Sequence, residues 1–129
     1  MAWFKTGGGG ALSETVLWTN SSPTTSFAAK TVTLSQSIAN FERVRIYWRG
    51  STSLATEASI DVSISDLQSF TGNSALRGSL GIINTNGSNY TRSFAYVNNT
   101  SIAFTNAYPF DNTSAVNIVA IPTKICGLK

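Results

Sequence analysis

Hydrophobic and polar residues alternate with a period of two along much of this chain. The clearest case is the stretch of residues 41–49, which is also rich in β-branched and aromatic side chains. Its apolar side chains fall on one side: Val44, Ile46 and Trp48. Its cationic and phenolic side chains fall on the other: Arg43, Arg45, Tyr47 and Arg49. A strand sorts residues in this way, whereas a helix spreads them around its axis, so we predict a long antiparallel strand with its apolar side buried.

Seven further stretches have the alternation or the β-branching of strands and are separated by turn residues. They are residues 14–19, 27–34, 58–65, 76–84, 90–97, 101–105 and 116–121. The pair Asn86-Gly87 lies between two of them and predicts a tight hairpin. Pro122 predicts that the last strand ends on an edge or at a bulge, and residues 106–115 are expected to form an irregular loop.

Two short segments break the strand pattern. Ile38 and Phe41 are spaced as in a single helical or 3₁₀ turn, capped by Ser35, and should plug one end of the core. A second short turn is expected at residues 66–70, capped by Asp66. The pattern contains no long helix and no repeat. It therefore predicts an all-β fold, an antiparallel and jelly-roll-like β-sandwich of about eight strands.

The first eleven residues are interpreted as a unit of their own. Trp3 and Phe4 precede four consecutive glycines, Gly7, Gly8, Gly9 and Gly10. Such a run cannot hold the interior of a helix or strand, so we interpret residues 1–11 as an anchor with a flexible tether and residues 12–129 as the β-sandwich domain. The segment could also be an expression scar or fold back onto its own domain. We favour docking of Trp3 and Phe4 on a partner protein, because exposed aromatics cost solubility.

Composition excludes several kinds of chemistry. The 129 residues fit one domain, and only 12% are charged, about half of the usual share. With one cysteine, Cys126, and no histidine, the chain cannot form an intrachain disulfide, a histidine-based triad or a histidine metal site. We expect no cofactor and no bound metal. No apolar run has the length of a membrane helix and no signal-peptide pattern opens the chain, so we expect neither membrane insertion nor Sec export.

The net charge of +3 has one local concentration, in the arginines of residues 41–49. These side chains could form a solvated strand face, which is the commoner situation. They could instead form a patch for an anionic glycan or a neighbouring subunit. No helix or aromatic–basic motif of a nucleic-acid reader accompanies them, so we expect no nucleic acid partner.

Several segments together resemble a module of tailed-bacteriophage structural proteins, chiefly tail, tail-fibre and baseplate proteins of phages of Gram-positive bacteria. The residues that carry the resemblance are Leu17-Trp18-Thr19-Asn20, Pro23, Phe27 with Thr31-Val32-x-Leu34, Ile38-x-x-Phe41, and Val44-x-Ile46-x-Trp48. The opening MAWFKTGGGG is similar to the start of small phage tail proteins. The closing IPTKICGLK resembles their usual Ile-Pro-x-Lys-Ile-Tyr-Gly-Ile-Lys, with Cys126 in the place of the tyrosine. The similarity covers both ends and the first third of the chain.

This resemblance implies a virion structural protein, displayed on the particle surface and taking part in host-surface attachment. It implies other virion proteins as partners of the N-terminal segment, and a homotrimer, the usual state of such fibre modules. A capsid-decorating or head-fibre protein is the first alternative, and a free carbohydrate-binding module is the second.

Aromatic residues near the predicted turns are the best candidates for recognition of a host glycan. They are Tyr90, beside the Asn86-Gly87 turn, and Tyr108 and Phe110, in the predicted loop. Sugars stack on aromatic faces, although most aromatics of a β-sandwich belong to its core. The six acidic residues are each explained as strand or turn surface residues, so we expect no enzymatic activity.

Overall fold

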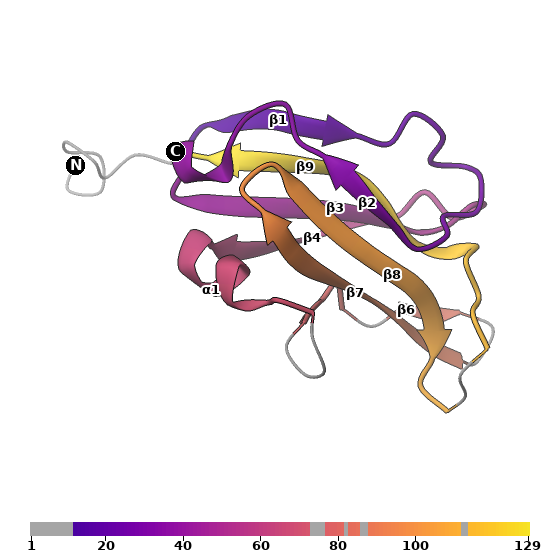
Figure 1. The fold of residues 1–129 in the computed structure, drawn as a ribbon. Coiled ribbons are helices and arrows are strands. Elements are labelled where there is room, and N and C mark those ends of the chain that lie inside the picture. The colour runs from indigo at the N-terminus through magenta and orange to yellow at the C-terminus, as the bar shows by residue number, and fades with distance from the viewer. Residues whose placement is uncertain (1–11, 73–76, 82, 86–87, 112–113) are drawn as a thin grey trace, which may run out of the picture.

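The computed structural model describes residues 12–72, 77–81, 83–85, 88–111 and 114–129. In these parts of the chain, nine strands form two antiparallel sheets that face each other as two layers (Figure 1). The predicted anchor and tether, with Trp3, Phe4 and Gly7 to Gly10, lie outside the described residues. The predicted all-β sandwich is confirmed.

The first sheet has four strands in the order β1-β9-β3-β4. Their bounds are Glu14–Thr19 for β1, Val119–Leu128 for β9, Arg43–Ser51 for β3 and Glu57–Ser63 for β4. The second sheet has the order β2-β8-β7-β5, and β6 also pairs with β7. The bounds are Lys30–Thr33 for β2, Ser101–Pro109 for β8, Ser88–Asn98 for β7, Gly78–Ser79 for β5 and Ile83–Thr85 for β6. Strands from the two ends of the chain pair in both sheets, β1 with β9 and β2 with β8, which gives the sandwich its jelly-roll-like interleaving.

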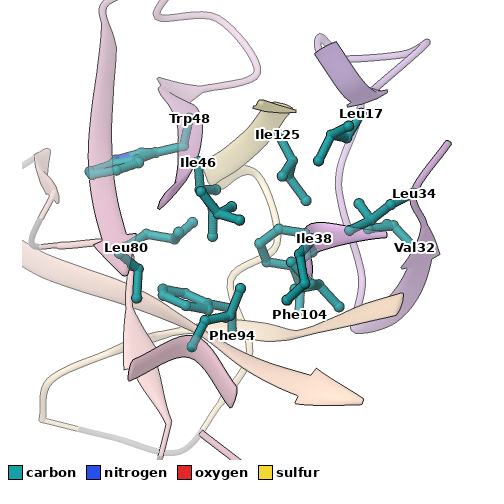
Figure 2. Packing of buried hydrophobic residues seen from close by; sticks show 14 of the residues in the cluster. Leu17, Val32, Leu34, Ile38, Ile46, Trp48, Leu80, Phe94, Phe104 and Ile125 are labelled. Carbon is teal, nitrogen blue, oxygen red and sulfur yellow. The ribbon is translucent and has the colours of Figure 1, made fainter. Parts of the chain in front are cut away.

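The core lies between the two sheets (Figure 2). In β3 the alternation is complete: Val44 and Ile46 are fully buried, Trp48 is nearly so, and the residues between them are half-buried. The facing sheet contributes Phe94, Ile102 and Phe104. Burial of each such side chain contributes about 1.5–3 kcal/mol, so β3 is held in one register by its apolar side.

The second strand is shorter than predicted. It begins at Lys30, and residues 27–29 leave the ladder: the Phe27 amide donates to the Asn117 carbonyl at 2.9 Å, and the Ala29 amide to the side-chain oxygen of Asn106 at 2.8 Å. Phe27 is therefore buried on the same side as Val32, which strict alternation from residue 27 would not allow.

The last two strands are longer than predicted. The expected loop 106–115 is wrong in its first part, because β8 continues to Pro109. The final strand begins three residues later than predicted and runs through Pro122 to Leu128. Pro122 is accommodated by a bulge, since the partners of Tyr47 and Trp48 are Lys124 and Pro122, with Thr123 left between them. The bulge expected at the proline is therefore present, but the prediction that the strand ends there is wrong, and β9 is no edge strand because it lies between β1 and β3.

Both short helical turns exist but have other caps than predicted. The 3₁₀ turn is Ile38–Asn40, and Ser37, not Ser35, accepts from the Ala39 amide. The helix α1 is Ile64–Ser69, and its cap is Ser63, not Asp66. Each true cap directly precedes its helical turn, the position from which a hydroxyl reaches the free amides of the first turn.

The predicted strand 76–84 divides into β5 and β6. Gly78 is a point of close approach, because a Cβ there would overlap the ring of Phe94. Between the two strands, Gly81 has a φ of 121°, which favours glycine. The pairing of Thr85 with Ser88 confirms the predicted hairpin, whose turn residues 86–87 lie outside the described residues.

Candidate functional site

The outer face of the four-stranded sheet carries the predicted arginine cluster. We call it the charged face and define it by the outward side chains Glu14, Arg43, Arg45, Tyr47, Arg49, Asp61 and Lys124. They come from all four strands, because β9 and β4 flank β3 and β1 lies beyond β9.

Arg45 is the centre of this face. Its Nε and Nη2 donate to the two carboxylate oxygens of Asp61 at 2.6 and 2.9 Å, and its Nη1 donates to Glu14 at 3.0 Å. The Tyr47 hydroxyl donates to the other Glu14 oxygen at 2.7 Å, and Lys124 Nζ lies 4.5 Å from the centre of the Tyr47 ring. The arginine fork therefore joins β3 to two other strands through carboxylates of this same chain.

The electrostatics of the charged face agree with that geometry. The hydrogen bond from Tyr47 lowers the pKa of Glu14, with Arg45 as a further cause. The hydrogen bond from Arg45 lowers the pKa of Asp61. The pKa of the neighbouring Cys126 thiol is raised to about 11, mainly by burial and in second place by its hydrogen bond to Glu14. Both carboxylates are thus held in the charged form, the opposite of what the general acid of a glycosidase requires.

Arg49 is also engaged within the chain. Its Nε donates to the Ser51 carbonyl at 2.8 Å and its Nη2 reaches that of Thr52 at 3.4 Å. Arg45 and Arg49, two of the three clustered arginines, therefore donate hydrogen bonds to groups of the same chain. This favours a solvated structural face over an anion-binding patch.

The outer face of the five-stranded sheet contains a groove of about 390 Å³. We call it the β7–β8 groove and define it by its lining residues: Ala29, Arg77, Ser93, Phe104, Thr105, Asn106 and Tyr108. Thr105, Asn106 and Tyr108 come from β8, Ser93 from β7, and Arg77 directly precedes β5. None of these residues is acidic, in contrast to the charged face.

The polar side chains of the groove are held by hydrogen bonds. The Asn106 oxygen accepts from the Ala29 amide at 2.8 Å and from Asn117 Nδ2 at 3.0 Å. Its amide nitrogen lies 3.4 Å from the Tyr108 hydroxyl. The Thr105 hydroxyl accepts from the Ser93 amide at 3.1 Å. These contacts fix the orientation of the amide and the hydroxyl before any ligand arrives.

The three predicted recognition aromatics do not form one site. Tyr108 lies on β8, opposite Thr91, and lines the groove. Tyr90 pairs with the buried Pro109, so it projects toward the inner side of the same sheet. Phe110 is 59% exposed and lines a separate depression of about 200 Å³ with Ser88, Asn89 and Asp111.

A buried arginine lies behind the groove. Arg92 on β7 is fully buried, and its three nitrogens donate to the backbone carbonyls of Ala120, Thr105 and Val119 at 2.8, 2.6 and 3.2 Å. Its guanidinium also lies 5.1 Å from the centre of the Phe27 ring. Burial lowers its pKa to about 10, so it stays charged at neutral pH. Arg92 therefore joins β8, which lines the groove, to the start of β9 in the other sheet.

Sequence reasoning missed Arg77, Ser93, Asn106 and Arg92. Alternation along residues 90–97 puts Arg92 on the same side of the strand as Phe94, so its burial could have been inferred from the sequence. The other three gave no local signal, because the groove depends on the extension of β8 and on the bulges in its pairing with β7.

Across the described residues, no group of three or more Asp, Glu or Cys side chains is arranged to hold a metal ion. The same parts of the chain contain no helix with the length and hydropathy of a membrane span.

Comparison with known proteins does not assign the chain to a family. No model of a protein family matches it, and no curated protein matches it either.

Proposed function

We propose that this chain is a structural protein of a bacteriophage virion, displayed on the particle surface and taking part in host attachment. Its N-terminal segment would bind another virion protein through Trp3 and Phe4, and the β-sandwich would face outward. A tail-fibre or baseplate position is the first choice, and a capsid-decorating or head-fibre position is the alternative.

One observation carries the proposal: the residues of the phage-like pattern form one structural unit. Leu17, Val32, Leu34, Ile38, Ile46 and Trp48 come from separate segments and pack together in the core (Figure 2). Phe41 packs against the same cluster, with its ring over Gly127. The spacing that resembles phage modules is therefore the spacing that this sandwich needs.

Deletion of residues 1–11 tests the attachment. The shortened chain should keep the β-sheet circular dichroism and the melting temperature of the full chain, because the described core begins at Leu17, but it should be absent from purified particles. Trp3→Ala with Phe4→Ala should act like the deletion, and Arg43→Ala, on the charged face, should incorporate normally. Incorporation of the shortened chain at the full-length level would contradict the proposal, and immunogold labelling would separate tail from capsid.

The assembly is expected to be a homotrimer, as in most fibre modules of the resembled kind. Light scattering on the full chain at micromolar concentration measures this directly. A monomer would count against the trimer while leaving particle attachment to be judged by incorporation.

The β7–β8 groove also fits the second alternative, a free carbohydrate-binding module. Such a protein would bind glycan equally well with and without residues 1–11 and would be absent from particles. Incorporation and glycan binding, measured on the same deletion variant, separate the two functions.

A further inference from the structure

We infer that the β7–β8 groove binds an acidic saccharide, that is, a hydroxyl-bearing sugar with a carboxylate or phosphate group. The inference deepens the host-attachment part of the proposed function and depends on it for its biological meaning. The binding itself can be tested on the isolated chain.

Arg77 provides the recognition of negative charge. Its Nε and Nη2 donate to the Gly72 carbonyl at 3.3 and 3.0 Å, which anchors one edge of the guanidinium. Within the described residues Arg77 forms no ion pair, whereas Arg45 forms two. A guanidinium with N–H groups left over is suited to a planar carboxylate or a phosphate. The ligand should therefore carry an anionic group at this end of the groove.

Asn106 and Tyr108 provide the recognition of the sugar. The Asn106 oxygen is occupied by two donors of the chain, and one of its amide N–H groups is directed at the Tyr108 hydroxyl at 3.4 Å, so the other N–H group remains for a ligand oxygen. Tyr108 is half-buried on the outer side of β8 and offers an aromatic edge or face for the C–H groups of a pyranose. An amide, hydroxyl and aromatic set matches a polyhydroxylated ring better than an apolar ligand.

The shape and the rigidity of the groove agree with this ligand. A volume of about 390 Å³ is at the small end of ligand sites, which suits one or two sugar units rather than a protein segment. The lining lies mainly on paired strands with fixed side chains, so little conformational entropy is lost on binding. A nucleic acid would require several cations along a track, and Arg77 is the one basic residue in the lining.

Isothermal titration calorimetry on the full chain tests the inference with three probes. They are a glucuronic acid oligosaccharide, glucose 6-phosphate and a neutral glucose oligosaccharide. Each is titrated up to about 10 mM, so that even a weak complex with a dissociation constant of about 1 mM is detected. At least one acidic probe should bind, and it should bind at least about tenfold more tightly than the neutral oligosaccharide. The comparison of the two acidic probes separates a carboxylate ligand from a phosphate ligand.

Paired variants locate the site. Arg77→Ala should weaken binding of the acidic probe by about tenfold, and Tyr108→Ala by about two- to tenfold. Arg43→Ala, which removes the same charge from the opposite face, should leave the affinity unchanged. Circular dichroism of each variant checks that the fold is intact, and Arg77 is exposed, so its replacement should not unfold the chain.

Three results would overturn the inference: no heat of binding with either acidic probe, equal affinity for the neutral oligosaccharide, or equal losses in Arg77→Ala and Arg43→Ala. Particle incorporation keeps this separate from the proposed function. Arg77→Ala should incorporate normally, so a chain that enters particles without binding acidic sugars refutes the groove alone. A chain that binds them without entering particles refutes the virion role alone.

Discussion

The two outer faces of the sandwich contain the same kinds of side chain and use them differently. On the charged face, Arg45 and Tyr47 meet carboxylates from the neighbouring strands β1 and β4. In the β7–β8 groove, Arg77 and Tyr108 have hydroxyl, amide and carbonyl neighbours instead. The difference shows that the partners of an arginine on neighbouring strands decide whether it is free to bind a ligand. The number of arginines close together in the sequence does not decide this.

The comparison also explains why the arginine-rich strand is a weak candidate for recognition. A bidentate arginine–carboxylate pair satisfies both charges within the chain, so an external anion would have to compete with Asp61 and Glu14. Within the described residues, no carboxylate of the chain competes for Arg77, although no pattern in the sequence marks this arginine as a candidate.

The largest effect is expected from the support behind the groove. Arg92→Met should lower the free energy of unfolding by about 3 kcal/mol, because it leaves the carbonyls of Ala120, Val119 and Thr105 without their buried donor. Urea denaturation followed by tryptophan fluorescence measures this. Arg77→Met is the matched control and should change stability by less than about 0.5 kcal/mol, since Arg77 is exposed. Equal midpoints for Arg92→Met and the natural chain would refute the role of Arg92.

The next effect concerns the strand that borders the groove. Gly78→Ala should destabilise the chain by about 1–3 kcal/mol, since the new methyl group overlaps the ring of the fully buried Phe94. Gly50→Ala meets the side chain of Leu54, which is 45% exposed and can move aside, and should cost less than about 1 kcal/mol. Thermal melting of both variants checks the order, and a reversed order would contradict the close approach of Gly78 to the Phe94 ring.

A smaller change is expected on the charged face. Arg45→Ala should lower stability by about 0.5–1 kcal/mol, because its ion pairs are partly exposed and screened by solvent. The same variant should keep the affinity for the acidic saccharide, which is the sharpest functional contrast with Arg77→Ala. If Arg45→Ala abolished binding and Arg77→Ala did not, the roles of the two faces would be reversed.

The smallest effect is a dependence of stability on pH. The folded-state pKa values of Glu14 and Asp61 lie below their ordinary values of 4.5 and 3.8. Their contribution is therefore fully present above those values and is lost as the pH falls through the folded-state pKa values. Urea midpoints measured from pH 7 to pH 2 should fall at the acidic end, and less steeply in Arg45→Ala. A profile that is identical in the two proteins would contradict the network.

The sequence predicted the layered fold because burial on one side leaves a pattern of period two. Val44, Ile46 and Trp48 are at once the strongest signal and the centre of the core. The ends of strands were less accessible to prediction, because they depend on tertiary bonds such as that from Ala29 to Asn106. The same cause hid the groove, whose residues come from separate segments and meet only after β7 and β8 pair with their bulges.

Tyr108 shows which part of a site can be predicted from the sequence. Its role in recognition stays a prediction, and its expected place in a loop is wrong, because Asn106 and Pro109 are typical turn residues that here belong to a strand. In the structure Asn106 is part of β8, where its side chain caps the backbone of Ala29. The separation of Tyr90 from Tyr108 follows from strand parity, which becomes predictable only once the register is known.

The most direct test is chemical-shift mapping of the isotopically labelled chain as the acidic saccharide is added. The account predicts that perturbed amides gather at Ser93, Thr105, Asn106 and Tyr108, around Arg77, while those of Arg43 to Arg49 stay in place. Perturbations on β3 instead, with the amides of β7 and β8 unchanged, would contradict the claim that the β7–β8 groove binds the ligand while the charged face pairs its charges within the chain.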